Sequence, residues 1–151
     1  DSPSALAWTP RGDTLLVALQ GNNRVIGIDA LGLAPITGNN QANTTLTSPA
    51  VATLDLGAGL APQGLLVDAA GRRLFIQDFL GRTVTVRDAA PLLDENRTTL
   101  PLLATTPTVA VEPLAAEVLQ GKRIFYNAAD PRMSADSYLS VPAIISAAAI
   151  T

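Results

Sequence analysis

Apolar residues in this chain come in short runs, and each run ends at residues that favour a turn. Two groups of three such runs stand out, at residues 5–9, 14–19 and 24–29 and at residues 64–68, 73–79 and 83–88. Runs of this length are too short for convincing helices, and their Val, Ile, Thr and Phe content favours strands. The pattern therefore predicts six short β-strands in two groups.

The two groups are copies of one sequence unit. Pro3 to Ala30 aligns with Pro62 to Ala89 without a gap at an offset of 59 residues, with seven identities in 28 positions. The identical pairs are Pro3/Pro62, Leu6/Leu65, Gly12/Gly71, Leu15/Leu74, Val25/Val84, Asp29/Asp88 and Ala30/Ala89. Apolar and turn-forming positions coincide elsewhere in the alignment as well, which indicates an internal repeat.

Turn chemistry recurs at the same offset. Thr9-Pro10-Arg11-Gly12 and Asp68-Ala69-Ala70-Gly71 link the first and second runs of each copy. Thr or Asp at the first position of a type I turn accepts a local hydrogen bond, and Gly at the fourth tolerates positive φ. The "GNN" and "LGR" stretches at 21–23 and 80–82 predict tight hairpins between the second and third runs. We therefore expect positive φ at Gly12 and Gly71.

A fourth apolar run follows each copy, at residues 50–56 and at residues 98–106. Pro101 inside the latter suits an edge strand, and the polar residues 32–49 are expected to form an exposed insertion before the former. Four antiparallel strands with tight inner turns, repeated, are the unit of a β-propeller blade. The alternative is a meander or sandwich with a chance repeat, and the recurrence of turn chemistry favours blades.

The predicted fold class is therefore all-β, with about two four-stranded β-propeller blades followed by a short helix and an irregular tail. Blade 1 covers about 3–56 and blade 2 about 62–108, within a propeller region of residues 1–112. We expect Leu15, Val17, Leu74 and Ile76 to be buried in the inner strands. Because propellers need roughly four to eight blades, two blades leave an open edge and unburied faces. The expected partners are further propeller blades or a partner protein chain.

Composition excludes several classes of site. The 151 residues include no Cys and no His, which excludes disulfides, thiolate chemistry and His ligands. We assign no catalytic residue and no metal site. The formal net charge of −3, with no basic run, argues against a nucleic-acid partner. The apolar tail at 141–151 falls short of the roughly 20 residues that span a bilayer, so no membrane span is expected.

The residues after the second blade predict a helix. Pro113 suits its first turn, and Glu117 early with Lys122 and Arg123 late match the helix dipole. Asp130-Pro131 is expected to end the helix. The apolar face would be formed by Leu114, Val118, Ile124 and Phe125, with Gly121 allowing close packing.

Two family resemblances extend this interpretation. Residues 2–30, "SPSALAWTPRGDTLLVALQGNNRVIGIDA", and residues 61–89 resemble the YVTN-type β-propeller repeats of bacterial secreted and periplasmic proteins. Residues 121–140, "GKRIFYNAADPRMSADSYLS", resemble the opening of the cytochrome domain in bacterial di-haem cytochrome c peroxidases and their propeller-fused relatives. The resemblance implies a periplasmic or secreted location, with residues 113–151 as the start of a cytochrome c domain.

The haem-attachment motif of that family is not present here. A Cys-x-x-Cys-His motif follows the opening segment in the family, whereas Val141, Ile144 and Ile145 stand at the expected positions in this chain. Without thiols and His there is no thioether attachment and no proximal ligand, so no haem c is expected in this chain. Either the remainder of the cytochrome domain is missing, or the far end of the segment has been replaced.

The resemblance makes Phe125, Tyr126 and Arg132 candidates to lie near haem c in a complete relative. The alternatives are packing of both aromatic rings on the propeller and a salt bridge from Arg132 to Asp130 or Asp136.

Two functions are compatible with these residues. The first is a non-catalytic β-propeller scaffold or interaction module of a larger secreted or periplasmic bacterial protein. The second is a part of a haem-dependent cytochrome c peroxidase-like oxidoreductase whose haem sites lie outside this chain.

Overall fold

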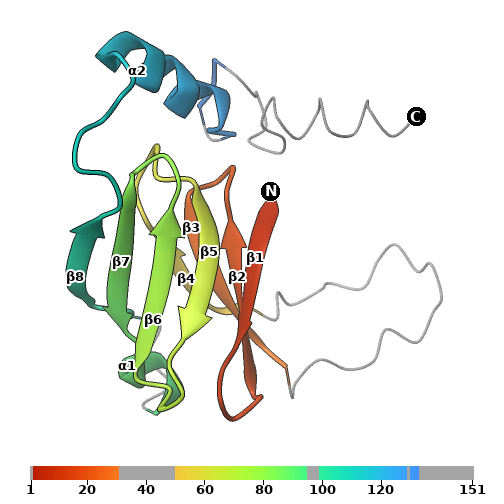
Figure 1. Ribbon diagram of the computed structural model, residues 1–151. Helices are drawn as coiled ribbons and strands as arrows, with labels where there is room; N and C mark the ends of the chain where they lie inside the picture. The colour runs from red at the N-terminus through yellow and green to blue at the C-terminus, as the bar shows by residue number, and fades with distance from the viewer. Residues whose placement is uncertain (1, 31–49, 95–98, 129, 133–151) are drawn as a thin grey trace, which may run out of the picture.

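Two four-stranded antiparallel sheets pack against each other in the computed structural model (Figure 1), which describes residues 2–30, 50–94, 99–128 and 130–132. The first sheet contains β1 (Pro3–Trp8), β2 (Thr14–Leu19), β3 (Arg24–Asp29) and β4 (Ala50–Asp55). The second contains β5 (Pro62–Val67), β6 (Arg73–Asp78), β7 (Thr83–Asp88) and β8 (Leu102–Pro107). In both sheets the strands follow chain order. The all-β class and the two β-propeller blades are confirmed, and the sheets are called blade 1 and blade 2 below.

The first turn of each blade has the predicted geometry. The Gly12 N–H donates to the Thr9 carbonyl at 2.9 Å, and the Gly71 N–H donates to the Asp68 carbonyl at the same distance. Both glycines have positive φ, at 70° and 69°. The Thr9 hydroxyl accepts from the Thr14 N–H at 3.2 Å, and Asp68 Oδ1 accepts from two N–H groups in the equivalent turn. The predicted turn chemistry is therefore confirmed in both copies.

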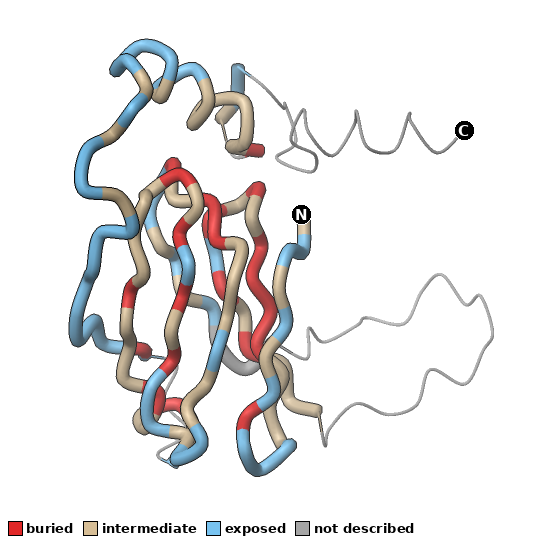
Figure 2. Tube along the Cα trace, in the orientation of Figure 1, coloured by how far each residue is buried: buried red, intermediate tan, exposed pale blue. Residues whose placement is uncertain are grey.

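The hydrophobic core lies between the blades. Its fully buried members come from both sheets and include Leu16 and Val25 of blade 1 and Leu74 and Ile76 of blade 2. Figure 2 shows buried positions along β2 and β6, whereas β8 is exposed along its length. The core is thus an interface between two blades rather than the interior of either one.

The predicted burial is confirmed for three of the four residues and is wrong for Leu15. Val17, Leu74 and Ile76 are buried, whereas Leu15 is only partly buried and its neighbour Leu16 is fully buried. Successive strand residues point to opposite faces, and the Leu16 face of β2 is the one that packs on blade 2. Val17 shares the face of Leu15 and lies between Leu6 and Ile26, its paired residues on the flanking strands.

The outer strand of blade 2 begins later than predicted. β8 starts at Leu102, so Pro101 precedes the strand instead of lying inside it. The Pro101 carbonyl accepts a hydrogen bond from the Asp88 N–H at 2.8 Å, a role that needs no N–H from the proline. β8 is the edge strand of its sheet, as predicted.

A short helix that the sequence did not indicate follows β7. α1 (Ala90–Leu93) begins beside Asp88, whose Oδ1 accepts from the Ala90 N–H at 3.0 Å. Its residue Leu92 is 6% exposed and belongs to the core between the blades. α1 therefore closes one end of that core (Figure 1).

The second helix, α2 (Ala116–Phe125), is shorter than predicted at both ends. Pro113 lies before its first turn, and the helix ends at Phe125 with Tyr126 as the C-terminal cap, before Asp130-Pro131. Glu117 lies in the first turn and Lys122 with Arg123 in the last, as predicted.

The packing of α2 also differs from the prediction. The side chain of Val118 is 57% exposed, and a Cβ on Gly121 would meet nothing within 4 Å. The helix contacts the blades through its C-terminal end, so its first turns remain in solvent and Gly121 makes no close approach.

Candidate functional site

The surfaces most suited to an interaction are the two blade faces that do not pack on each other. On blade 1 the centre of this face is formed by two rows of paired residues from β1, β2 and β3, Leu6/Val17/Ile26 and Trp8/Leu15/Ile28. Leu6 is 64% exposed and Trp8 57%. All six residues are apolar, although Val17 is only 7% exposed. The adjoining row on the same side of the sheet contains the Arg24–Asp55 ion pair, with Nε and Oδ2 3.7 Å apart. This face, called here the free face of blade 1, therefore presents a hydrophobic sheet surface with a charged pair at one end.

Blade 2 has a corresponding free face. Its two rows are Gly64/Gln77/Val84 and Leu66/Phe75/Val86. Leu66 is 62% exposed. A shallow hollow of about 240 Å³ lies on this face, and it is lined by Gly64, Leu65, Leu66, Phe75, Gln77 and Val84. Gly64 contributes no side chain, and the Gln77 side chain lies beside it, since a Cβ on Gly64 would be 3.0 Å from Gln77 Oε1.

The buried faces show what such a surface packs against. Blade 1 contributes the rows Ala5/Ala18/Val25 and Ala7/Leu16/Gly27, and blade 2 contributes Leu65/Ile76/Thr85 and Val67/Leu74/Arg87. Small residues of blade 1 thus face large residues of blade 2. The edge strands β1 and β5 meet at this junction, where the Ser4 hydroxyl donates to the Pro62 carbonyl at 2.6 Å.

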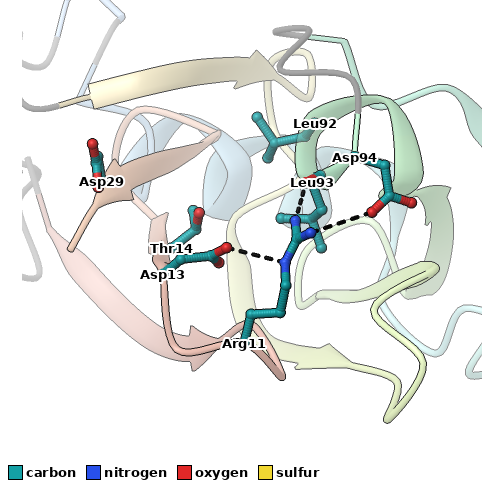
Figure 3. Close-up of a pocket in the computed structure, with 7 residues that line it drawn as sticks. All are labelled: Arg11, Asp13, Thr14, Asp29, Leu92, Leu93 and Asp94. Carbon is teal, nitrogen blue, oxygen red and sulfur yellow. Dashed lines mark hydrogen bonds and ion pairs between the residues drawn. The ribbon is translucent and has the colours of Figure 1, made fainter. Parts of the chain in front are cut away.

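Arg11 joins the blades at the end where α1 lies, as Figure 3 shows. Its Nε lies 3.0 Å from Asp13 Oδ2 and its Nη1 3.5 Å from Asp94 Oδ1, and Nη2 donates to the Leu93 carbonyl. Arg11 belongs to the first turn of blade 1, whereas Leu93 and Asp94 follow β7 of blade 2. The side chains of Arg11 and Asp94 are about half exposed, so each ion pair contributes little stability.

The cavity beside Arg11 has the features of a structural junction. It has a volume of about 330 Å³ and is lined by Arg11, Asp13, Thr14, Asp29, Leu92, Leu93 and Asp94. A hydrogen bond from the Thr9 hydroxyl to Asp13, aided by Arg11, lowers the pKa of the Asp13 carboxyl. Among the described residues no group of three or more His, Cys, Asp or Glu side chains is placed to hold a metal ion.

The Asn23 side chain bonds to two other segments at the end of the blades opposite α1. Its Oδ1 accepts from the Leu60 and Ala61 N–H groups at 3.0 and 2.9 Å, on the segment that leads into blade 2. Its Nδ2 donates to Asn127 Oδ1 at 3.1 Å, just beyond α2. Asn23 has φ of 54° and is 3% exposed. One buried amide therefore connects blade 1, blade 2 and the segment that follows α2.

Arg82 occupies the position equivalent to Asn23 in the second copy. It also has positive φ, at 55°. The Asn23 carbonyl accepts from the Leu56 N–H at 2.9 Å and the Arg82 carbonyl from the Thr108 N–H at 2.8 Å. The Arg82 Nε lies 3.1 Å from Glu112 Oε2, on the segment that leads to α2. The residue at this turn position therefore binds the segment that leaves each blade. That segment leads to blade 2 in the first copy and to α2 in the second.

The haem-proximal candidates lie near this end of the molecule. The Tyr126 ring is T-shaped to Phe79, with centroids 5.9 Å apart, and to Phe125 at 5.5 Å. The Lys122 Nζ lies 4.6 Å from the centroid of Phe79. Tyr126 thus packs on the turn between β6 and β7, which is the alternative given above for the aromatic residues.

Arg132 forms the predicted salt bridge with Asp130. Its Nη2 lies 2.6 Å from Asp130 Oδ2 and its Nε 2.9 Å from Oδ1. This forked pair, through the hydrogen bonds from Arg132, lowers the pKa of Asp130 to about 2. Asp136, Val141, Ile144 and Ile145 lie outside the described residues. The role of the three candidates beside a haem stays a prediction.

Asp78 is a buried carboxyl that the sequence did not single out. It is 1% exposed, and its Oδ2 accepts from the Thr85 hydroxyl at 3.1 Å and the Thr83 hydroxyl at 3.4 Å. Its Oδ1 accepts no hydrogen bond from the described residues. Burial raises the pKa of Asp78, and the hydrogen bonds from Thr85 and Thr83 oppose the rise. By sequence alone Asp78 is only the polar end of a predicted strand, so its burial becomes visible only in the folded structure.

Comparisons with known proteins support the fold. No protein-family model matches the chain, and no curated protein does. A putative 6-phosphogluconolactonase from Bacteroides fragilis matches with a TM-score of 0.51 and 18% identity, over 72% of this chain and 28% of that one. The periplasmic gluconolactonase PpgL of Pseudomonas aeruginosa matches with a TM-score of 0.50 and 20% identity, over 73% and 27%. The β-propeller domain of Cps50 (Swd1) from Myceliophteria thermophila has a TM-score of 0.49 and 21% identity, over 70% and 28%.

At these identities, likeness shows the fold alone. The chain spans less than a third of the length of each of these structures. No helix in the part of the chain that the structure describes is long and apolar enough to cross a membrane.

Proposed function

We propose that this chain is a non-catalytic β-propeller scaffold or interaction module, and that its free blade faces are the surfaces it uses. The observation that carries the proposal is the free face of blade 1, where six apolar residues of β1, β2 and β3 form two neighbouring rows of the sheet. Soluble proteins rarely leave a contiguous apolar surface of this kind uncovered unless something binds it. In β-propellers such faces are covered by neighbouring blades.

The proposal places the chain in a larger secreted or periplasmic bacterial assembly. The resemblance of residues 2–30 and 61–89 to YVTN-type repeats supports this location, and the resemblance of residues 121–140 supports a propeller joined to a cytochrome-like segment. Further blades are the partners that the faces fit.

The exposure of the faces can be tested with a dye that fluoresces on apolar surfaces, such as ANS. Dilute, folded protein should bind the dye, and a double variant, Leu6→Glu with Leu66→Glu, should bind several-fold less because a charge interrupts both faces. Val111→Glu is the matched control, since Val111 is 80% exposed and lies outside both faces. Folded, dilute protein that leaves the dye dark would overturn the proposal.

Absorbance near the Soret band addresses the oxidoreductase alternative. A longer protein that contains this chain, produced in a host that matures c-type cytochromes, should show no Soret band if the chain is part of a scaffold only. A stoichiometric Soret band on that longer protein would favour the cytochrome c peroxidase-like oxidoreductase instead.

A further inference from the structure

We infer that the free face of blade 2 in one molecule docks on the free face of blade 1 in a second copy of this chain, head to tail. The inference rests on the proposed function and specifies the partner. It starts from the junction between blades 1 and 2, which is already a blade-to-blade interface inside one chain.

The repeat maps each free face onto a buried one. At the offset of 59 residues, the free rows Leu6/Val17/Ile26 and Trp8/Leu15/Ile28 of blade 1 correspond to the buried rows of blade 2, Leu65/Ile76/Thr85 and Val67/Leu74/Arg87. The free rows of blade 2 correspond in the same way to the buried rows of blade 1. Each free face therefore occupies the position in its blade that is packed in the other blade.

The chemistry of the two free faces suits burial against each other. At the positions of Thr85 and Arg87, the free face of blade 1 has Ile26 and Ile28, so it is more apolar than its buried counterpart. The free face of blade 2 contains no charged residue in its two rows. Docking over these central rows therefore removes apolar area from water, and the charged residues of the adjoining rows, Arg24 with Asp55 on blade 1 and Arg73 with Asp88 on blade 2, lie at the ends of the two faces.

Shape supports the same pairing. The hollow of about 240 Å³ on the free face of blade 2 is open beside Gly64 and Phe75. The free face of blade 1 projects the large exposed side chains Leu6 and Trp8. At the junction within the chain, Ser4 donates to the Pro62 carbonyl, and Gln63, which aligns with Ser4, supplies an amide at the equivalent edge of β5.

Contacts of this kind are heterologous, because one face meets a different face of the neighbour. Such contacts close into a ring when the rotation between copies allows it. With two blades in each copy and roughly four to eight blades in a propeller, a closed ring contains about two to four copies.

Light scattering of the 151-residue protein at increasing concentration tests the inference. We expect a discrete assembly of about two to four copies, as a propeller of that size requires. Trp8 is the only tryptophan, so its emission should shift to shorter wavelength as the assembly forms. Trp8→Glu and Leu66→Glu should each abolish the assembly, and Val111→Glu should not.

Mixing the two face variants separates head-to-tail docking from other association. Trp8→Glu leaves the free face of blade 2 intact, and Leu66→Glu leaves that of blade 1 intact. Their mixture should form a one-to-one dimer, although each variant alone stays monomeric. If Leu66→Glu still assembled like the wild type, face-to-itself docking would replace the proposed mode.

A folded wild-type monomer at high concentration would overturn self-assembly. If that monomer still bound ANS, the proposed function would stand, with the covering blades supplied by another polypeptide. If it did not bind ANS, the proposed function would fail as well.

Discussion

At the scale of single residues, two glycines hold conformations that other side chains rarely adopt. Gly12 and Gly71 have φ near 70°, but an added Cβ would meet nothing within 4 Å at Gly12 and only ordinary contacts, at 3.6 Å or more, at Gly71. Replacing either by Val should therefore destabilise the fold by about 1–3 kcal/mol through backbone strain rather than through a clash.

Urea unfolding of Gly12→Val and Gly71→Val measures this cost. Gly121→Ala is the control, because Gly121 lies in α2 with open space around its Cβ position and should gain up to about 1 kcal/mol of helix propensity. Unchanged midpoints in both Val variants would rule out strain at these turns.

Asp78 predicts an unusual dependence of stability on pH. Burial raises its pKa in the folded state above the unfolded value, so the folded protein binds the proton more tightly. The contribution of Asp78 to stability is then fully present below the unfolded pKa and is lost as pH rises through the folded pKa.

Asp78→Asn removes this titration and keeps an oxygen that can accept from Thr85. Relative to the wild type, the variant should gain stability as pH rises from about 4 to 7, where the buried carboxylate of the wild type becomes charged. Thermal melts of both proteins at the two pH values give the comparison. An equal difference in melting temperature at both values would contradict the role given to burial.

At the scale of elements, Asn23 connects a hairpin turn to two other segments. Asn23→Ala should leave the buried N–H groups of Leu60 and Ala61 without their acceptor and place Ala at positive φ. We expect a loss of about 2–4 kcal/mol, since an unsatisfied buried donor costs about 1–3 kcal/mol.

Asn127→Ala provides the comparison on the α2 side. It removes the acceptor for Asn23 Nδ2 but leaves both bonds to the Leu60 and Ala61 N–H groups, so it should cost clearly less. Denaturant unfolding of the two variants decides the matter, and equal losses would mean that the junction between blades does not depend on Asn23.

At the scale of the whole molecule, the two blades share one core and keep two apolar faces free. Each blade packs against the other blade with one face only. The residues on its second face align, at the repeat offset, with residues that are buried in the other blade. Small residues on one buried face and large ones on the other give the junction a direction, from blade 1 to blade 2. Because of this direction, a further copy or blade added at either end would pair a face of the blade 1 type with a face of the blade 2 type.

Much of the fold could be predicted from residues close together in the sequence. β2, β3 and β7 have the predicted bounds, because short apolar runs rich in β-branched residues have few other uses. Gly12 and Gly71 were placed correctly, since a type I turn that ends in Gly is set by four consecutive residues. The YVTN resemblance, the periplasmic location and the haem-proximal roles stay predictions.

Other features depended on contacts that the pattern does not contain. In "TLLVAL" every residue but the first is apolar, so alternation could not show which face of β2 meets blade 2, and Leu15 was chosen where Leu16 is buried. α2 was predicted too long because Pro113 suits a first turn locally, whereas the Arg82–Glu112 pair and the Leu114 N–H bond to Glu112 hold that segment outside the helix.

The sequence by itself thus determined the strands, the tight turns and their repetition, since each depends on interactions within a few residues. Only the tertiary structure decided which apolar face is buried, how Asn23 and Arg11 join the blades, and that Asp78 lies out of water. These depend on residues such as Asn23 and Asn127 or Arg11 and Leu93, which lie 104 and 82 positions apart and meet only when the two sheets pack.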